Sequence, residues 1–318
     1  IQASIVIRDE MQGEDFIITL PAKKLQDILK VFPDNAEITF ERQDNKILVK
    51  SKATKFTLQS LLADHYPLLK IADDPVCQFT LEQIALKKLL GQIQYAMADK
   101  DSRVFLNGML FEIKENQLRL VATDAHRLGF VTTPISEKVE DYSAIIPRKT
   151  IIELYKILED SSNGVTIKLY PSQVCFEADS KQLITKIIDG KYPDYERVIP
   201  LNNDKLCLIR RDDLLKAIER VAVIGIDKLK TVTFEIQKNL LILTCHNEDQ
   251  EDSLDEVEIT YQHDEKLKVS FNINYVRDLL INSHVENLQW AFFDGQRSVL
   301  ITVPNDANFK SVLMPLRP

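Results

Sequence analysis

The residues best suited to chemistry in this sequence are Asp124, His126 and Arg127, which lie within four consecutive positions. A carboxylate next to an imidazole can support general base catalysis in a hydrolase. Covalent catalysis would also need an activated Ser or Cys, and neither occurs here in a recognisable nucleophile motif. A histidine that packs in the structure or contacts a ligand is therefore favoured, and a hydrolase that uses Asp124 and His126 is the weaker alternative.

The four cysteines form no CxxC pair, which is typical of buried, reduced thiols in a cytosolic protein; they are Cys77, Cys175, Cys207 and Cys245. Cys245 and His246 are adjacent, but adjacent side chains on a strand point to opposite faces and cannot bind one metal ion together. The chain has 8 glycines and contains neither GxGxxG nor GxxxxGK, so no loop for nucleotide phosphates is evident. We expect no metal site, no cofactor and no enzymatic activity.

The composition is that of a globular protein with two or three domains. The chain has 318 residues, of which 45% are hydrophobic and 28% charged, and its net charge is −8. Its longest apolar run, Val221–Ile226, is too short to span a bilayer, and the N-terminus does not resemble a signal peptide. These features predict a cytoplasmic location.

One pattern occurs five times, and it predicts the architecture. Each copy is a short apolar strand followed by an amphipathic helix, and the copies start at residues 16, 79, 144, 207 and 269, so that successive starts are 63, 65, 63 and 62 residues apart. Alternating strands with polar turns follow each helix. The fold class is therefore α+β, built from β-α-β-β-β units. One helix cannot cover a sheet alone, so we expect the units to pair into domains.

Five units cannot all pair, and this predicts an incomplete first domain. One further period before residue 16 places a sixth start about 47 residues before Ile1 (16 − 63 = −47). Ile1–Ile7 would then be the last strand of that sixth unit. We expect domains at residues 1–76, 77–204 and 205–318, of which the first is N-terminally incomplete.

The predicted helices carry the opposite charge to the rest of the chain. Across residues 21–31, 80–98, 147–159, 210–221 and 271–283 there are 13 Lys and Arg against 8 Asp and Glu, a net of +5, so the remainder carries −13. This bias is expected of a surface that follows DNA phosphates. Lysine also commonly occupies exposed helix positions, and charge alone does not decide between these interpretations.

Several motifs, in order and along essentially the whole chain, resemble those of the bacterial DNA polymerase III beta subunit family, the replicative sliding clamps. They are Leu106–Phe111, Val121–Leu128, Ile146–Lys149, Asp189–Tyr195 with Arg197–Pro200, and Val312–Arg317. The resemblance implies paired units forming DNA-clamp domains in a head-to-tail dimeric ring of six domains, with helices lining the hole and sheets outside. Such a ring encircles duplex DNA without reading its sequence and tethers the replicative polymerase. The implied DNA-facing residues are Lys23, Lys24, Lys30, Lys87, Lys88, Lys100, Arg103, Arg148, Lys149, Lys156 and Lys216.

The resemblance also implies a hydrophobic pocket that binds short linear peptides of polymerase, clamp loader and repair proteins. Ala125 stands where the family commonly has Gly, and Leu316 where it commonly has Met, so we expect altered affinity but retained binding. The residues implied to line the pocket are Leu106, Thr123, His126, Arg127, Leu128, Pro193, Arg197, Val198, Met314, Pro315, Leu316 and Arg317.

The acidic stretch from Glu248 to Glu258 has three interpretations: a solvated loop, a cation site, or a subunit junction. The resemblance favours the junction, where acidic residues would face a basic edge strand of the neighbouring subunit. Lys50 and Lys52 are expected on one face of that strand by two-residue alternation. The implied interface residues are Lys50, Lys52, Lys55, Val223, Ile224, Asp249, Glu251 and Asp252.

A second function follows if the first domain is incomplete. The chain would then be a repeat scaffold that binds peptides but no longer closes a ring.

Overall fold

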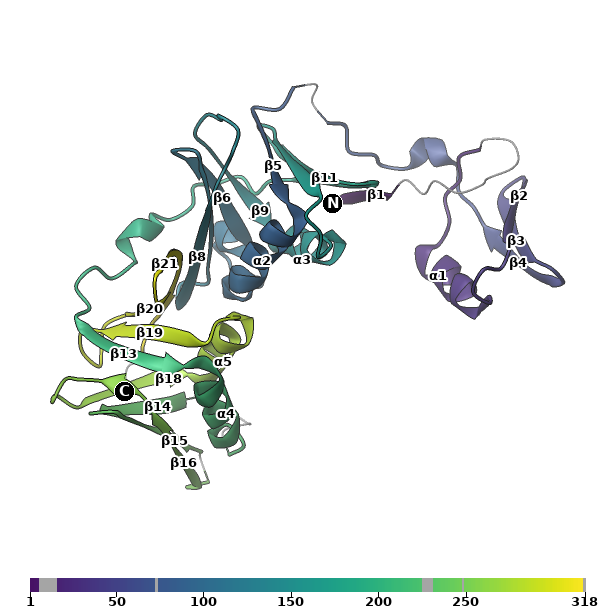
Figure 1. The fold of residues 1–318 in the computed structure, drawn as a ribbon. Coiled ribbons are helices and arrows are strands. Elements are labelled where there is room, and N and C mark those ends of the chain that lie inside the picture. Colours follow the sequence, from purple (N-terminus) through teal and green to yellow (C-terminus); the bar gives the residue numbers. More distant parts are fainter. Residues whose placement is uncertain (6–15, 72–73, 225–230, 248, 317–318) are drawn as a thin grey trace. The chain divides into compact units, whose positions relative to one another are not determined.

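The computed structural model describes residues 1–5, 16–71, 74–224, 231–247 and 249–316 (Figure 1). The chain divides into two compact units, one of residues 7–70 and one of residues 1–6 with 71–318.

The larger unit contains four successive β-α-β-β-β repeats, which confirms the predicted α+β class and repeat. The first two, here called the central pair, are β5 (Cys77–Glu82), α2 (Gln83–Ile93), β6 (Gly108–Lys114), β7 (Gln117–Thr123) and β8 (Arg127–Pro134), then β9 (Tyr142–Pro147), α3 (Arg148–Ile157), β10 (Gly164–Leu169), β11 (Gln173–Ala178) and β12 (Lys181–Lys186).

The other two repeats, here called the C-terminal pair, have the same order with one short extra strand. They are β13 (Lys205–Arg210), α4 (Arg211–Val221), β14 (Thr231–Gln237), β15 (Leu240–His246), β16 (Asp252–Glu258) and β17 (Thr260–Tyr261), then β18 (Leu267–Asn272), α5 (Ile273–Asn282), β19 (Asn287–Phe292), β20 (Val299–Val303) and β21 (Asp306–Leu313).

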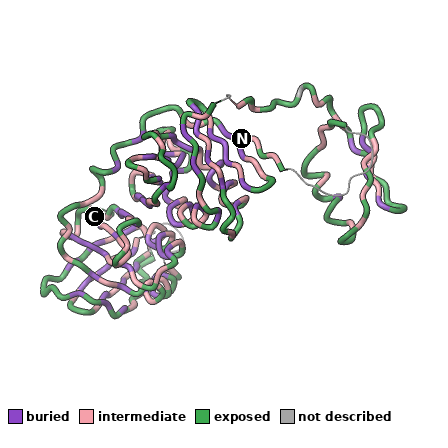
Figure 2. Tube along the Cα trace, turned by 45° about the horizontal axis from the view of Figure 1, so that its top comes forward, coloured by how far each residue is buried: buried purple, intermediate pink, exposed green. Residues whose placement is uncertain are grey.

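Within each pair, the first strand of one repeat joins the sheet of the other repeat. β5 pairs antiparallel with β10, and β9 with β6; likewise β13 pairs with β19, and β18 with β14. This exchange places two sheets face to face with two helices packed beside them, so that the pair buries one core. Figure 2 shows buried positions along the strands and the inward helix faces. The helix residues fully buried there include Leu86 and Leu90 of α2 and Leu214 and Ile218 of α4.

Backbone pairing also joins the central pair to the C-terminal pair. β8 pairs with β21, with Leu128 opposite Val312, so one nine-stranded sheet runs β17-β13-β19-β20-β21-β8-β7-β6-β9. At the far side, β1 (Gln2–Ile5) pairs with β12 and extends the five-stranded sheet of the central pair. The expected N-terminal strand within Ile1–Ile7 is therefore present.

The described part of the smaller unit has one α-helix and three strands: α1 (Ala22–Val31), β2 (Thr39–Gln43), β3 (Lys46–Ser51) and β4 (Thr54–Gln59). Ile28, Ile47, Val49 and Leu58 form its core. The predicted strand at residues 16–20 is wrong, because Phe16–Leu20 has no strand pairing. The first strand of a repeat pairs in the sheet of its partner repeat, and the described part of this unit contains no partner repeat.

Among the described residues, no helix has both the length and the apolar character needed to cross a membrane.

All four cysteines are buried and free, as predicted. Burial raises the pKa of each thiol, and for Cys175 and Cys207 it does so to about 12. Only the thiolate reacts readily, and at pH 8 a raised pKa leaves almost no thiolate. We therefore expect Ellman's reagent to modify none of the cysteines of the native protein at pH 8 within minutes, and all four after denaturation. Rapid modification of one thiol in the native protein would contradict this packing.

Candidate functional site

A cavity of about 260 Å³ lies where the central and C-terminal pairs meet. Leu106 and Leu128 come from the central pair, Met314 follows β21, and Pro193 and Val198 come from the segment that connects the pairs. The complete lining is Arg103, Phe105, Leu106, Thr123, Ala125, His126, Arg127, Leu128, Pro193, Tyr195, Val198, Val312 and Met314. Mostly apolar walls with a few polar groups at the edge are typical of a site for apolar side chains of a ligand.

The turn between β7 and β8 builds one wall of this cavity. Asp124 Oδ1 accepts the backbone N–H groups of His126 at 2.9 Å and Arg127 at 3.0 Å. The Thr123 hydroxyl donates to the Arg127 carbonyl at 2.7 Å and accepts the Ala125 N–H at 3.1 Å. Ala125 has φ 73°, a left-handed conformation that costs a residue with a side chain about 1 kcal/mol or more. The surrounding hydrogen bonds hold this conformation, so the wall is rigid.

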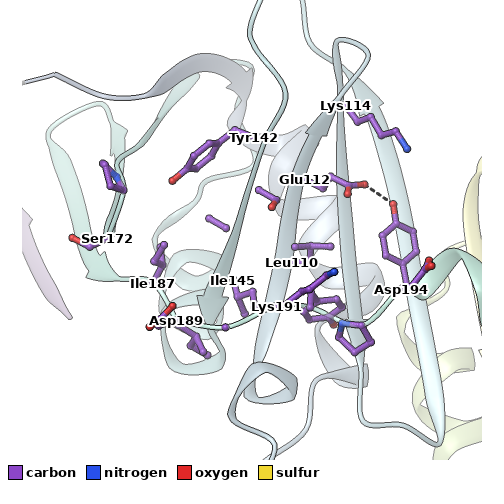
Figure 3. A pocket seen from close by; sticks show the side chains of 18 of the residues that line it. Leu110, Glu112, Lys114, Tyr142, Ile145, Ser172, Ile187, Asp189, Lys191 and Asp194 are labelled. Atoms are coloured by element: carbon purple, nitrogen blue, oxygen red, sulfur yellow. Dashed lines mark hydrogen bonds between the residues drawn. The ribbon is translucent and has the colours of Figure 1, made fainter.

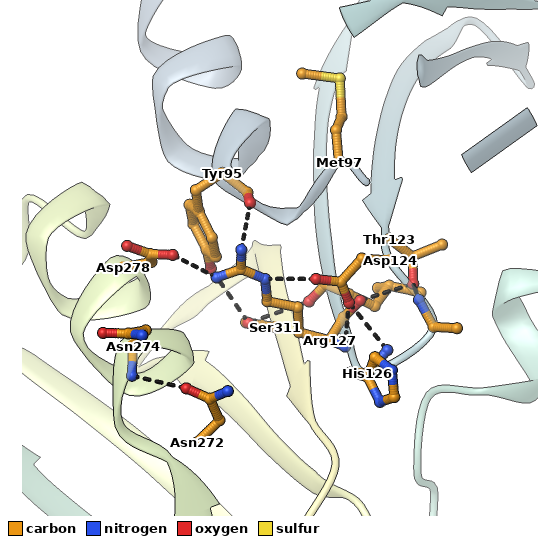
Figure 4. A network of polar contacts seen from close by, with 12 residues as sticks. Tyr95, Met97, Thr123, Asp124, His126, Arg127, Asn272, Asn274, Asp278 and Ser311 are labelled. Atoms are coloured by element: carbon orange, nitrogen blue, oxygen red, sulfur yellow. Dashed lines mark hydrogen bonds and ion pairs between the residues drawn. The ribbon is translucent and has the colours of Figure 1, made fainter. Parts of the chain in front are cut away.

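Arg127 joins the two pairs at the edge of the cavity (Figure 4). Its Nε lies 3.0 Å from Asp124 Oδ2, its Nη2 donates to the Tyr95 carbonyl at 2.7 Å, and its Nη1 lies 2.6 Å from Asp278 Oδ2. The guanidinium also lies 5.2 Å from the ring centre of Tyr95 and 4.4 Å from that of Tyr275. Asp278 and Tyr275 belong to α5 of the C-terminal pair, so one side chain, only 10% exposed, binds both pairs.

The tyrosines beside Arg127 are held in their neutral form. Burial raises the pKa of Tyr95 to about 12, and burial likewise raises the pKa of Tyr275. The Tyr95 hydroxyl lies 3.5 Å from Ser311 Oγ, which donates to the Leu128 carbonyl at 3.1 Å. The polar contacts of this junction therefore continue from the 3-10 turn Gln94–Ala96, which follows α2, across to β21.

The hydrolase alternative does not fit these contacts. The carboxylate of Asp124 is bonded to backbone N–H groups and to Arg127, while the ring of His126 stacks on Tyr275 with centroids 6.3 Å apart. Within the described ranges, no group of three His, Cys, Asp or Glu residues could hold a metal ion.

The structure brings most of the predicted pocket residues together. Leu106, Thr123, His126, Arg127, Leu128, Pro193, Val198 and Met314 all line the cavity. Arg197 does not: its side chain is 86% exposed and pairs with Asp194 at 2.8 Å. Pro315 lines an adjoining cavity of about 430 Å³, and Leu316 donates its N–H to the Ser270 carbonyl. Arg317 lies outside the described residues.

Five lining residues were not assigned to the pocket from the sequence: Arg103, Phe105, Ala125, Tyr195 and Val312. Ala125, Tyr195 and Val312 belong to the motifs Val121–Leu128, Asp189–Tyr195 and Val312–Arg317. Phe105 directly precedes the Leu106–Phe111 motif, and its position there was the available signal. Arg103, which was assigned to the DNA-facing set, lies in the lining beside Phe105. The guanidinium of Arg103 donates to the carboxylate of Asp101 at 3.0 and 2.9 Å. These bonds lower the pKa of the Asp101 carboxyl to about 2.

Most of the other predicted DNA-facing cations are exposed, but three are already engaged. Lys87 pairs with Asp160 at 2.9 Å, Lys156 pairs with Glu153 at 3.0 Å, and Arg148 donates to the Met97 carbonyl at 2.9 Å. Among the described residues of helices α1–α4, the exposed cations of this set that form no ion pair are Lys23, Lys24, Lys30, Lys88, Lys149 and Lys216. Lys100 is exposed beyond α2.

Of the predicted interface residues, Lys55 and Asp252 lie on edge strands, whereas Lys50 lies on β3, the middle strand of the β2-β3-β4 sheet. Lys50 and Lys52 do not share a strand face, because β3 ends at Ser51 and Lys52 lies in the following turn with φ 51°. Lys50 pairs with Glu41 and lies opposite Lys55 on β4. In the larger unit, β16 is an edge strand that begins at Asp252, while Asp249 and Glu251 precede it; Val223 is exposed and Ile224 half-buried after α4.

Comparison with protein-family models decides the family. The N-terminal, central and C-terminal domain models of the DNA polymerase III beta subunit match residues 1–70, 80–194 and 196–317. The chain belongs to the DNA polymerase III beta subunit family. The match of the N-terminal model to residues 1–70 does not confirm the expected incomplete first domain.

Individual relatives agree with this assignment. The chain is 34% identical to the beta sliding clamp of Escherichia coli K12 over 299 residues, which are 94% of this chain and 81% of that protein. It is 33% identical to the clamp of Haemophilus influenzae over 96% of this chain and 83% of that protein. A crystal structure of the Pseudomonas aeruginosa sliding clamp bound to griselimycin has a TM-score of 0.92 at 32% identity, covering 97% of this chain and 84% of that one.

The protein is thus a DNA sliding clamp, a non-catalytic processivity subunit, and not a hydrolase. The scaffold alternative, in which the ring no longer closes, is not favoured by these similarities, which cover 94–97% of this chain.

The Arg127 contacts predict a large effect on stability. Arg127→Ala removes the cation partner of Asp124 and Asp278 and leaves the Tyr95 carbonyl without its donor, so we expect the free energy of unfolding to fall by about 2–4 kcal/mol. Chemical denaturation followed by tryptophan fluorescence would measure this, since Trp290 is buried in the C-terminal pair.

The control is Arg197→Ala, which removes an 86% exposed arginine with a single ion pair and should cost less than about 0.5 kcal/mol. Equal losses for the two variants would show that Arg127 does not hold the junction.

Proposed function

We propose that two copies of this chain form a head-to-tail ring around duplex DNA and hold the replicative polymerase, clamp loader and repair proteins there through short linear peptides. The apolar cavity between Leu106, Leu128 and Met314 is the observation that carries the peptide-binding part of this proposal. A tethered polymerase rebinds the primer end before it diffuses away, because the tether keeps its local concentration high.

The cavity suits a peptide with apolar anchor residues. Met314 has a flexible side chain that adapts to different anchors, and the backbone N–H of Met314 is held by the His126 carbonyl at 2.9 Å. The Pseudomonas aeruginosa clamp, which shares this fold, is bound to griselimycin in its crystal structure. We propose as pocket residues those of the predicted set that line the cavity, with Arg103 and Phe105 added. Arg197, Pro315 and Leu316 would act at its margin.

The DNA would run along the exposed faces of the helices. Exposed lysines such as Lys23, Lys88, Lys149 and Lys216 contact phosphates without reading bases, which permits sliding. Lys87 and Lys156 would first have to leave their carboxylate partners, so their contribution should be smaller.

Ring closure would use two edge strands. The β16 edge carries Asp252 and Leu254, and the basic β4 edge carries Lys55 with Lys50 opposite it. Strand pairing with opposite charges would join one subunit to the next. We propose domains at residues 1–76, 77–204 and 205–318, and a cytoplasmic location. We also propose that residues 16–62 are one repeat of a first domain whose partner repeat is not found in the described residues.

The peptide site makes a direct prediction. A capped hexapeptide with Leu and Phe anchors should bind the wild-type protein, and Met314→Ala should weaken that binding about tenfold, because it removes apolar contact area from the cavity. Isothermal titration calorimetry measures both dissociation constants.

Ile281→Ala is the matched control, since Ile281 and Met314 are both 41% exposed and Ile281 lies on α5 outside the cavity. A peptide that binds wild type and Met314→Ala equally well would place the binding site elsewhere.

The interface makes a second prediction. Lys52→Glu with Lys55→Glu puts acidic residues against the acidic β16 edge, so the dimer dissociation constant should rise at least about fivefold at 50 mM salt, and less at 500 mM. Sedimentation equilibrium gives both constants.

The control is Lys46→Glu with Lys70→Glu, which changes the net charge by the same amount at exposed positions away from the β3–β4 turn and should leave the dimer constant nearly unchanged. An unchanged dimer constant in the first variant at low salt would refute this interface.

A further inference from the structure

A second cavity, of about 990 Å³, lies outside the pocket discussed so far (Figure 3). Its floor is the outer face of β6 and β9, where Leu110, Glu112 and Lys114 alternate with core residues of β6. The segment from Ile187 to Glu196 forms one wall. Ser172 and Ile187 lie at one side of the cavity and Lys114 and Asp194 at the other, with Lys191 between them.

This cavity, here called the lateral cavity, adjoins the peptide pocket. Pro193 and Tyr195 line both cavities. The Tyr195 ring packs against Phe130 of β8, and its hydroxyl donates to Glu112 Oε2 at 2.5 Å. Tyr195 is therefore a fixed divider between the two cavities, and a chain that leaves the peptide pocket past Pro193 enters the lateral cavity.

Some charged side chains that line the lateral cavity have hydrogen-bond or ion-pair partners, and others have none. Three of its carboxylates are occupied: Glu112 by Tyr195, Asp194 by Arg197 at 2.8 Å, and Glu196 by Arg119 at 3.1 Å. In the part of the chain that the structure describes, Lys186, Lys191 and Asp189 are exposed lining residues with no hydrogen bond or ion pair of their side chains. Lys186 and Lys191 therefore have ammonium groups available to an anionic ligand, whereas the third lining lysine, Lys114, lies 3.8 Å from Glu196.

We propose that the lateral cavity binds an acidic stretch of the partner peptide, directly next to the apolar anchors that fill the peptide pocket. This inference rests on the proposed peptide site and adds a second recognition element to it. Lys186 and Lys191 would bind Asp or Glu side chains of that stretch, and the anchors would determine its starting point. Partners with an acidic flank would then be preferred over partners that have the anchors alone.

The test compares three kinds of capped peptide by isothermal titration calorimetry. One is the hexapeptide with Leu and Phe anchors; the second adds six alternating Asp and Ser residues, about 20 Å of extended chain; the third adds six Ser and Asn residues. Each extension is made at the N-terminus and, separately, at the C-terminus. We expect the acidic extension at one terminus to lower the dissociation constant about threefold to tenfold at 50 mM salt, and the neutral extension to have no effect.

Lys186→Glu with Lys191→Glu should abolish this gain and leave binding of the unextended hexapeptide unchanged. Lys138→Glu with Lys266→Glu, at exposed positions outside the lateral cavity, is the control for net charge and should retain the gain. The inference is overturned if neither acidic extension improves binding, or if both double variants reduce the gain equally. Failure of the proposed peptide site is a separate result, because the unextended hexapeptide would then not bind.

Discussion

The antiparallel pairing of β8 with β21 is the interaction on which the functional site depends. It places Leu128 opposite Val312 and Arg127 opposite Leu313, and the chain then continues to Met314, whose N–H bonds to the His126 carbonyl. A shift of this register by one residue would turn every side chain of β21 to the other face of the sheet. The apolar cavity and the Arg127 contacts exist because two pairs of repeats share this one ladder.

The same constraint explains the repeats. A β-α-β-β-β unit has one helix and too little sheet to bury a core, and the exchange of first strands lets two units bury one together. Strand pairing also joins the two pairs to each other, through the ladder between β8 and β21. At the other edge of the central pair, β1 adds a strand beside β12. Sheets that are continuous across such junctions leave few free edges, and the remaining edges are where further subunits can pair.

Much of this could be predicted from the sequence, because it depends on local patterns. The repeat period and the strand-helix pattern identified the elements, and the Val121–Leu128 motif identified the wall of the cavity, since a turn forms from residues close in sequence. Tyr95, Tyr275 and Asp278 were not assigned to the Arg127 contacts, because residues so far apart meet only through the tertiary structure. The alternating pattern of the sequence predicted that Lys52 lies on the same strand as Lys50. In the structure β3 ends at Ser51, one residue before Lys52. Phe16–Leu20 has the composition of a strand but no neighbour to pair with, and pairing determines a strand more than propensity does.

Retention on DNA of different topology tests the central claim most directly. After loading onto a nicked circular duplex, a closed ring should stay bound through gel filtration at roughly 0.3 M salt, where electrostatic contacts alone are largely screened. Cutting the circle once should release it, because a ring slides off a free end. Equal retention on circular and cut DNA, or none on either, would contradict the account of this chain as a clamp that encircles DNA.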